Sequence, residues 1–296
     1  MYRYSIYGLT VSSELECPLL LSAKEQVDIT IRFGAIPSCC ISADTHKGAN
    51  FIGNGKLLLD IQEIAKYLIS DGNAVLIEPY PNAKEEMIRL FLLGSALGIL
   101  LHQRDILPLH GCGIVYNDKA ILFLGETGIG KSTLAETFRR KGYKLLTDDV
   151  SALCFSNDAS VKVFPAYPKI NLMEETAKNF NIPIEGLPEA HPQKRKYSIP
   201  VGESFCPDPK PLSRIYILHQ TDQKSIRLEV PQKIAAIPFL THNTYRKQVI
   251  EKMGLLQRHI DQCAHLADNY PVRLLSRPDD LSRLPELADC LESDFL

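Results

Sequence analysis

Residues 119–150 read KAILFLGETGIGKSTLAETFRRKGYKLLTDDV, and this stretch decides the fold. Within it, GETGIGKS at 125–132 matches the pattern G-x-x-x-x-G-K-[ST], with an apolar segment before it and a helix-favouring segment after it. A loop of this kind surrounds phosphate groups with backbone N–H groups, and the N-terminus of the following helix attracts the same anions. The stretch therefore predicts an α/β fold with a nucleoside triphosphate site at the loop. A glycine-rich surface turn is the alternative.

The individual loop positions have separate predicted roles. Gly125, Gly128 and Gly130 permit backbone angles and a close ligand approach that a Cβ atom would prevent. Lys131 is expected to reach the β- and γ-phosphates, and the Ser132 hydroxyl is expected to ligate Mg²⁺. The predicted nucleotide-binding positions in this stretch are Gly125, Glu126, Thr127, Gly128, Ile129, Gly130, Lys131, Ser132 and Thr133. ATP and Mg²⁺ are the predicted cofactors.

An acidic pair, Asp148 and Asp149, follows the next predicted strand. The predicted helix over 131–141, which Gly142 ends, descends about 16 Å at about 1.5 Å per residue. A strand over 143–147 returns about the same distance at about 3.3 Å per residue, so both carboxylates should lie level with the loop. There one carboxylate can bind the metal and the other can accept a hydroxyl proton. A single metal-binding carboxylate beside a solvated neighbour is the alternative.

The segment before the loop adds a histidine to this group. The Asn-Asp turn at 117–118 is typical of a β-hairpin. If Tyr116 pairs with Lys119, counting back places His110 opposite Gly125, beside the expected phosphates. An active-site role and a structural, hydrogen-bonded role for His110 both fit this position.

These motifs together resemble the catalytic half of HPr kinase/phosphorylase, which has a His-Gly pair, a GDSG-x-GKS loop and an acidic strand end. The matching residues here are His110-Gly111, the 125–132 loop and KGYKLLTDDV at 141–150. The resemblance implies that His110 belongs to the active site and that Lys131 binds phosphate. It also implies that Ser132 helps to hold Mg²⁺, and that Asp149, with Asp148 beside it, accepts the proton of the substrate hydroxyl.

One family signature is replaced in this chain. Where the family has a Glu-Ile-Arg-Gly-like segment, residues 165–175 read PAYPKINLMEE. Glu174 is the candidate metal ligand in this segment, together with Ser132 and Asp148. The replacement leaves the family's reverse phosphorylase reaction open.

A closer similarity extends over nearly the whole chain. The matching segments are YGLTVSSE (7–14), LFLLGSALGILLHQRDILPLHG (90–111), FPAYPKINL (164–172), LSRIYIL (212–218), HNTYR (242–246) and CAHLADNYPVRLLSRPDDLSRLPEL (263–287). These segments are similar to compact HPr-kinase-like proteins of ribosomal-peptide gene clusters, particularly the lasso-peptide tailoring kinases. That resemblance implies phosphorylation of a serine hydroxyl at the C-terminal end of a precursor peptide.

Composition and charge indicate which classes of binding partner the chain is not expected to have. The net charge of −2 and the pI near 6.5 give no general basic surface for nucleic acid or anionic lipid. The longest apolar run, 90–101, is too short to cross a membrane, and the N-terminus does not resemble a secretion signal. The eight cysteines show no zinc-site spacing, so reduced thiols and a cytoplasmic location are expected. Formation of a homo-oligomer is left open.

The predicted architecture is α/β, with an N-terminal β-rich module over 1–82 and a P-loop kinase core of HPr-kinase type over 83–296. The module is expected to contain strands over 2–11, 27–33, 51–60 and 74–78 and a short helix over 64–69. The core is expected to begin with a buried helix over 83–103. The sequence leaves three roles open for the N-terminal module: it recognises the substrate, covers the nucleotide site or completes the fold.

The C-terminal half of the chain adds one more candidate residue for phosphate binding. The proline-rich stretch 181–211 contains the basic segment Lys194-Arg195-Lys196, and Arg195 is the predicted phosphate contact because its planar fork binds oxygen atoms in pairs. A solvated basic segment is the alternative. Further predicted elements are a strand over 214–219 paired with 226–230, helices over 245–253 and 255–268, a strand over 272–275 and a last helix from 278 to 293.

The predicted function is that of an ATP-dependent serine kinase acting on a peptide or small protein. A kinase of a free metabolite would use the same residues and differ only in its acceptor pocket. A nucleotide-dependent switch is the second alternative, although the chain lacks an N-K-x-D guanine motif and an LSGGQ-type transporter signature.

Overall fold

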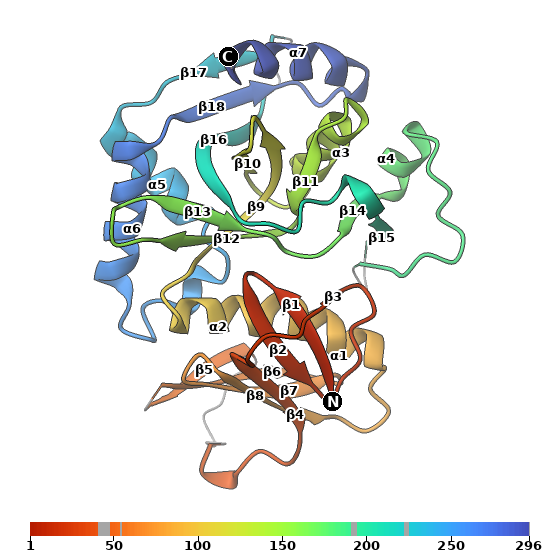
Figure 1. Ribbon diagram of the computed structural model, residues 1–296, viewed down its shortest axis with the longest axis vertical. Coiled ribbons are helices and arrows are strands. Elements are labelled where there is room, and N and C mark those ends of the chain that lie inside the picture. The colour runs from red at the N-terminus through yellow and green to blue at the C-terminus, as the bar shows by residue number, and fades with distance from the viewer. Residues whose placement is uncertain (41–47, 54, 191–193, 222–224, 296) are drawn as a thin grey trace. The chain divides into compact units, whose positions relative to one another are not determined.

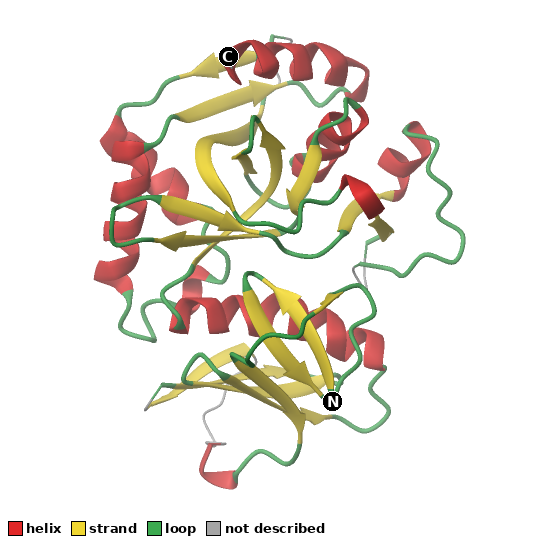
Figure 2. Cartoon of the chain, viewed as in Figure 1, coloured by secondary structure: helices red, strands yellow, loops and turns green. Residues whose placement is uncertain are grey.

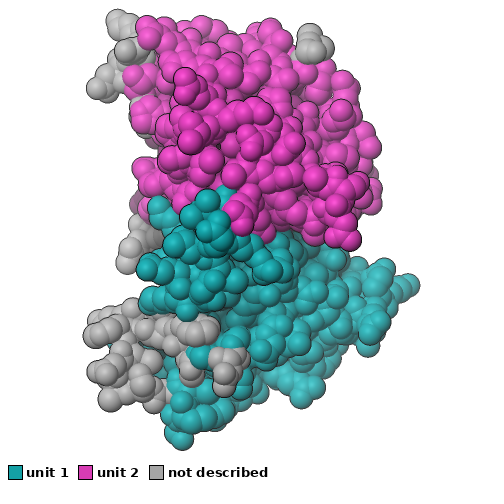
Figure 3. Space-filling model, turned by 90° about the vertical axis from the view of Figure 1, so that its left-hand side faces the viewer, with its two compact units in different colours: residues 1–108, 245–260 teal, residues 109–244, 261–296 magenta. Residues whose placement is uncertain are grey.

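The structure is a computed structural model that describes residues 1–40, 48–53, 55–190, 194–221 and 225–295. Helices and strands are mixed along the chain, in the α/β arrangement that the sequence predicts (Figure 1, Figure 2). Two compact units are present, one from 1–108 with 245–260 and the other from 109–244 with 261–296 (Figure 3). Among the helices in these described ranges, none is long and apolar enough to cross a membrane.

The first unit is built on an eight-stranded sheet with the order β3-β1-β2-β4-β8-β7-β6-β5. Its strands are β1 (Tyr2–Ile6), β2 (Leu9–Ser13), β3 (Leu21–Ser22), β4 (Ile29–Phe33), β5 (Gly48–Gly53), β6 (Lys56–Ile61), β7 (Ala65–Ser70) and β8 (Ala74–Pro79), with a short 3₁₀ segment η1 (Ser38–Cys40). The predicted strand over 2–11 is a hairpin, because Tyr7 and Gly8 form a tight turn with φ angles of 54° and 71°.

The prediction of a short helix over 64–69 is wrong. This segment is strand β7, which pairs on one side with β6 and on the other with β8. Six residues between two turns are too few for a stable helix, whereas pairing on both sides satisfies the backbone groups of a strand. The fully buried side chains of Tyr67 and Ile69 then contribute to the core.

The predicted helix over 83–103 is present as three consecutive segments: α1 (Glu85–Phe91), the π-helical segment η2 (Leu92–Ala96) and α2 (Leu97–Gln103). Tyr67 of β7 donates a hydrogen bond to the Ile88 carbonyl oxygen at 2.9 Å, and Gln103 donates one to the Gly55 carbonyl oxygen at 2.9 Å. The helix is therefore fastened to the N-terminal sheet. For this reason the chain divides after residue 108 instead of after the predicted residue 82.

The second unit contains a sheet with the order β10-β9-β12-β13-β16-β18-β17, in which β10 also pairs with β16 and β11 pairs with β9. Its strands are β9 (Leu107–Tyr116), β10 (Lys119–Leu124), β11 (Lys144–Thr147), β12 (Val150–Phe155), β13 (Val161–Phe164), β16 (Lys210–Gln220), β17 (Arg227–Glu229) and β18 (Val272–Arg277), and a separate hairpin consists of β14 (Lys169–Met173) and β15 (Lys196–Pro200). The remaining helical segments are α3 (Lys131–Arg140), α4 (Glu174–Asn179), η3 (Gly202–Ser204), α5 (Lys233–His242), η4 (Lys247–Val249), α6 (Leu256–Asn269), η5 (Leu281–Arg283) and α7 (Leu284–Phe295).

Three strands of this sheet, β10, β16 and β18, run parallel to one another. Their carboxyl ends lie at the same edge of the sheet, which is where open α/β folds bind ligands. The predicted pairing of 214–219 with 226–230 is wrong, because β17 pairs with β18 instead. Strand β16 is buried and needs partners on both sides, whereas β17 is short and largely exposed and occupies the edge.

The helix predicted over 245–253 is also wrong, since this segment contains only the short 3₁₀ segment η4. The helix of this region is instead α5, which accommodates Pro238 in its interior. Tyr245 packs so closely on the long helix that a Cβ atom on Gly98 would lie 2.6 Å from its ring, and Arg246 has a φ angle of 55°. Packing therefore fixes a non-helical backbone here. The helix predicted over 255–268, the strand over 272–275 and the C-terminal helix are confirmed.

Helix α3 is anchored by Phe138, which is fully buried. Its ring stacks on Phe123 of β10 with a centroid distance of 5.6 Å, and it meets the edge of Tyr143 at 5.2 Å. Phe295 of α7 packs on the same ring at 5.4 Å. This aromatic group fixes the position of the helix that begins at the glycine loop.

We expect Phe138→Ala to lower the free energy of unfolding of the full chain by about 3–5 kcal/mol, because it removes a buried ring and leaves a cavity. Equilibrium denaturation in urea measures this loss. Phe138→Leu, which retains most of the apolar volume, serves as the control and should lose less. An unchanged unfolding midpoint for Phe138→Ala would contradict the packing described above.

Candidate active site

The glycine loop joins β10 to α3 in the second unit. Gly125, Gly128 and Gly130 have φ angles of 148°, 93° and 96°, which side-chain-bearing residues rarely adopt. A Cβ atom on Gly125 would also lie 2.9 Å from the Ile129 side chain and 3.0 Å from the Leu218 carbonyl oxygen. The loop opens onto a cavity of about 1120 Å³. The cavity walls include His110, Thr127, Lys131, Ser132, Thr133 and Asp149, so the predicted residues from three separate segments meet there.

The hairpin of β9 and β10 positions His110 as its register predicts. Tyr116 pairs with Lys119, and Gly111 pairs with Leu124, so His110 lies next to the start of the loop. The Nδ1 atom of His110 lies 3.1 Å from the Asp149 carbonyl oxygen, which can only accept a hydrogen bond. Nδ1 must therefore carry the proton, and the Nε2 atom is left to accept a hydrogen bond from the Lys131 ammonium at 3.0 Å.

The ring of His110 is held in its neutral form. Burial, and secondarily the positive charge of Lys131, lower the pKa of His110 to about 4. The Thr127 hydroxyl lies 3.3 Å from the same Nε2 atom. At neutral pH this histidine therefore orients Lys131 and the Asp149 backbone and carries no charge of its own.

Lys131 is 7% exposed and begins helix α3. Besides the bond to His110, its ammonium group donates hydrogen bonds to the carbonyl oxygens of Gly125 at 2.7 Å and Glu126 at 2.9 Å. Burial lowers the pKa of Lys131 to about 8, so the cation is weakly solvated. A phosphate group in the loop would compete with the two carbonyl oxygens for this ammonium group, with the advantage of a full negative charge.

The two carboxylates of the acidic pair differ in their surroundings. The Oδ1 atom of Asp148 accepts a hydrogen bond from the Ser132 hydroxyl at 2.7 Å, and its Oδ2 atom accepts one from the Asn171 backbone N–H at 2.7 Å. Burial raises the pKa of Asp148 above its ordinary value. Asp149, in contrast, lines the cavity and has a φ angle of 73°. Ser132 and Asp149 thus line the cavity, and Asp148 is linked to it by its hydrogen bond to Ser132.

Three lysines and His110 surround Asp149 from several elements. Burial by itself opposes ionisation of this carboxyl group, but His110 of β9 when it is protonated, together with Lys196 of β15, Lys169 of β14 and Lys131 of α3, outweighs burial and lowers the pKa of Asp149. An ionised carboxylate in a cavity is able to accept a proton from a hydroxyl group.

The residues near Ser132 fit a magnesium ion. Magnesium prefers hard oxygen ligands and is often held by one or two carboxylates together with substrate phosphates. Ser132 and Asp148 supply a hydroxyl and a carboxylate oxygen within hydrogen-bond distance of each other. No group of three or more His, Cys, Asp and Glu side chains that could hold a metal occurs within the part of the chain that the structure describes.

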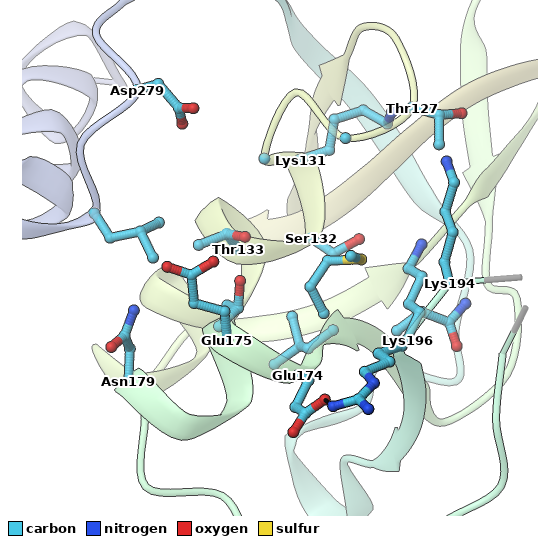
Figure 4. Close-up of a pocket in the computed structure, with 18 of the residues that line it drawn as sticks. Thr127, Lys131, Ser132, Thr133, Glu174, Glu175, Asn179, Lys194, Lys196 and Asp279 are labelled. Atoms are coloured by element: carbon cyan, nitrogen blue, oxygen red, sulfur yellow. Dashed lines mark hydrogen bonds and ion pairs between the residues drawn. The ribbon is translucent and has the colours of Figure 1, made fainter.

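Glu174, the third predicted metal ligand, is engaged elsewhere. Its carboxylate pairs with Lys178 at 2.6 Å and with Arg195 at 3.0 Å. Figure 4 shows this carboxylate directed away from Ser132. The geometry thus places Glu174 in an ion-pair network on α4 at the cavity wall.

The basic segment 194–196 contributes differently from the prediction. Arg195, the predicted phosphate contact, is 80% exposed and is paired with Glu174. Arg195 and Lys196 both line the cavity, but it is the positive charge of Lys196 that opposes the effect of burial on the pKa values of Asp148 and Asp149. The sequence does not distinguish these neighbours, because only the pairing of β14 with β15 decides which side chain faces the acidic pair.

Two functional candidates are missed by the sequence analysis. Lys169 is buried on β14 and donates hydrogen bonds to the Asn171 side chain at 3.0 Å and to Ser198 at 3.1 Å. Arg277, at the carboxyl end of β18, is also buried and donates a hydrogen bond to the Ile129 carbonyl oxygen at 2.6 Å, behind the glycine loop. Lys169 begins β14 and Arg277 ends β18, and charged residues are common at strand ends, so no local signal in the sequence singles out either residue.

The predicted loop residues do not all face the cavity. Thr127, Gly128, Gly130 and Thr133 are among its lining residues. The Glu126 carboxylate instead lies 3.3 Å from the His242 ring at an exposed position, and the Ile129 side chain packs toward the hydrophobic core. Neither the Glu126 nor the Ile129 side chain is therefore among the residues that line the cavity.

No protein-family model matches the chain, and no curated protein matches it. Among solved structures, the HPr(Ser) kinase/phosphatase from Coxiella burnetii is similar to it, with 16% sequence identity and a TM-score of 0.33. The match covers 64% of this chain and 95% of that protein. At this identity and TM-score, the likeness bears on neither the substrate nor the site residues.

Proposed function

We propose that this chain is a Mg²⁺- and ATP-dependent kinase that transfers the γ-phosphoryl group to a serine hydroxyl of a peptide or small protein. The observation that carries the proposal is the shared cavity of the glycine loop, Lys131, Ser132 and Asp149, with Asp148 hydrogen-bonded to Ser132 at its edge. A phosphate-binding loop alone would also serve a switch. Transfer to a hydroxyl group also needs a proton acceptor, and the Asp149 carboxylate in the cavity wall can serve as one.

Each residue has one task in this proposal. The loop N–H groups and Lys131 bind the triphosphate, and Ser132 and Asp148 would hold Mg²⁺. When bound, the ion neutralises negative charge on the phosphates. Asp149 accepts the proton of the acceptor hydroxyl as its oxygen bonds to the γ-phosphorus, while the bond from that phosphorus to the bridging β-phosphate oxygen breaks and ADP leaves. His110 orients Lys131 through its unprotonated Nε2 atom.

The proposed acceptor follows from the sequence resemblance to the lasso-peptide tailoring kinases. The first acceptor to test is therefore the precursor of a ribosomal, lasso-type peptide, with a serine at its C-terminal end. The cavity supports an acceptor that bears negative charge near the hydroxyl, because Lys194 and Lys196 line it beside Asp149.

Intact-mass analysis of candidate precursor peptides, incubated with the protein, ATP and Mg²⁺, tests the proposal. We expect the addition of one phosphate, and fragmentation should locate it on a serine. Shortening the peptide at a site far from that serine should reduce the rate, as it would for a peptide acceptor and not for a metabolite acceptor.

The same experiment can also contradict the proposed peptide acceptor. If Mg²⁺-ATP binds but no peptide gains mass, the peptide acceptor is wrong. Phosphorylation of free hydroxyl metabolites under the same conditions would then favour a metabolite kinase. Acceptor-independent ATP hydrolysis, coupled to a change in partner binding, would favour a switch.

A further inference from the structure

The cavity beside the glycine loop has two chemically different ends. Figure 4 shows Lys194 and Lys196 on one side of the view and Asp279 and Asn179 on the other, with Ser132 and Thr133 between them. His110, Lys196 and Asp149 line the cavity, and both His110 and Lys196 are close enough to Asp149 to affect its pKa. Arg277, Leu281 and Ser282 also line the cavity, and Asp279 is close enough to Arg277 to affect its pKa. A ligand held by the loop can therefore extend toward either of two distinct environments.

We propose that the end formed by Thr133, Asn179, Arg277, Asp279 and Leu281 is a nucleoside subsite, in which the Asp279 carboxylate accepts a hydrogen bond from a ribose hydroxyl. The inference rests on the proposed kinase function, because it takes the ligand of the loop to be a nucleoside triphosphate. The base is expected to lie against the guanidinium plane of Arg277 and the side chain of Leu281.

The direction of the nucleotide follows from the position of Asp149. The carboxylate that takes the proton from the substrate hydroxyl must lie near the γ-phosphate. In the proposed mechanism this carboxylate is Asp149, so the γ-phosphate lies toward His110, Lys196 and Asp149. The phosphates in between occupy the loop. The nucleoside must then leave the loop at the opposite end, toward Thr133 and the segment that follows β18.

Arg277 lies in the cavity wall at this end and has a fixed side chain. It lies at the carboxyl end of β18, parallel to the strand that leads into the glycine loop. Its guanidinium group is held in one position by hydrogen bonds to the carbonyl oxygens of Ile129 at 2.6 Å and Pro278 at 2.9 Å. Burial lowers the pKa of Arg277, and the cation is thus poorly hydrated. A planar, weakly hydrated guanidinium stacks favourably on an aromatic ring.

Asp279 and Asp280 are adjacent but differ in their partners. The Asp280 carboxylate accepts hydrogen bonds from the Ser282 backbone N–H at 2.9 Å and the Ser282 hydroxyl at 2.7 Å, so it serves the turn before η5. Asp279 has no hydrogen bond or ion pair to any residue that the structure describes, and it faces the cavity. Carboxylates are suitable acceptors for ribose hydroxyl groups.

The test compares the binding of ATP, 2′-deoxy-ATP, 3′-deoxy-ATP and inorganic tripolyphosphate to the full chain by titration calorimetry. The wild-type protein should bind ATP about tenfold or more tightly than one of the two deoxynucleotides, the expected effect of a hydrogen bond to a charged group. In Asp279→Ala this ratio should fall to about one. Asp280→Asn, which removes the neighbouring charge and keeps an oxygen acceptor for the Ser282 hydrogen bonds, is the matched control and should retain the wild-type ratio.

The affinity ratio, and not the affinity for ATP, is the informative quantity. Removal of the Asp279 charge also reduces repulsion of the phosphates, and tripolyphosphate measures this effect separately. If Asp279→Ala retains the wild-type ratio, or if the wild type does not distinguish ATP from either deoxynucleotide, the inference is wrong.

The inference and the proposed function can fail separately. If wild-type protein binds neither ATP nor tripolyphosphate, both are wrong. If the ribose-dependent ratio is present and disappears in Asp279→Ala, but no acceptor is phosphorylated, the nucleoside subsite stands and the kinase assignment fails.

Discussion

Asp149→Asn should lower the kcat of phosphoryl transfer by about 10²- to 10⁴-fold, the usual contribution of general-base catalysis. An amide cannot accept the hydroxyl proton, although it has nearly the same shape as the carboxylate. The affinity for ATP should stay close to that of the wild type, because Lys131 and the loop backbone provide the phosphate contacts. Turnover of the phosphorylated peptide and calorimetric ATP binding measure the two quantities.

Asparagine is the appropriate replacement because of the backbone at this position. Asp149 has a φ angle of 73°, in the left-handed region that asparagine also tolerates. Alanine would add backbone strain and would confound the result. The Asp149 carbonyl oxygen, which accepts hydrogen bonds from His110 and from the Gly111 N–H, is retained in Asp149→Asn.

Asp208→Asn is the matched control, since Asp208 is exposed and lies outside the cavity. It should retain both kcat and ATP affinity. Wild-type kcat in Asp149→Asn would show that this carboxylate is not the base.

Lys131→Met should weaken ATP binding by about 10- to 150-fold, which corresponds to the loss of about 1.5–3 kcal/mol for a hydrogen bond to a charged group. The variant should also have a lower kcat, because the same ammonium group neutralises charge on the transferred phosphoryl group. Calorimetry with ATP, ADP and AMP measures the loss. We expect the decrease to be smallest for AMP, which has no β- or γ-phosphate.

The thermal midpoint of Lys131→Met must be measured as well, because Lys131 also bridges the loop carbonyl oxygens and His110. Lys144→Met is a suitable control, since Lys144 is an exposed lysine in β11, outside the cavity. Equal losses of affinity for ATP and AMP would argue against contact between Lys131 and the terminal phosphates.

Much of the candidate site could be predicted from the sequence, because its central parts are close together in the chain. The strand before the loop, helix α3 and the strand before the acidic pair are consecutive elements, and their lengths fix the relative heights of Lys131 and Asp149. The position of His110 follows from a two-residue turn and the register that it imposes. In the first unit, turn residues and alternating patterns predict most strands, but not that 64–69 is a strand.

The sequence by itself determined the glycine loop, its hairpin, the acidic pair and the presence of most helices and strands, because neighbouring residues impose these features through backbone angles and periodicity. Only the tertiary structure decided that Lys196, and not Arg195, faces the acidic pair, and that Lys169 and Arg277 join the site. It also decided that β17 pairs with β18 and that 245–253 is not a helix. These outcomes depend on which distant segments bury one another's surfaces, and no local pattern specifies that choice.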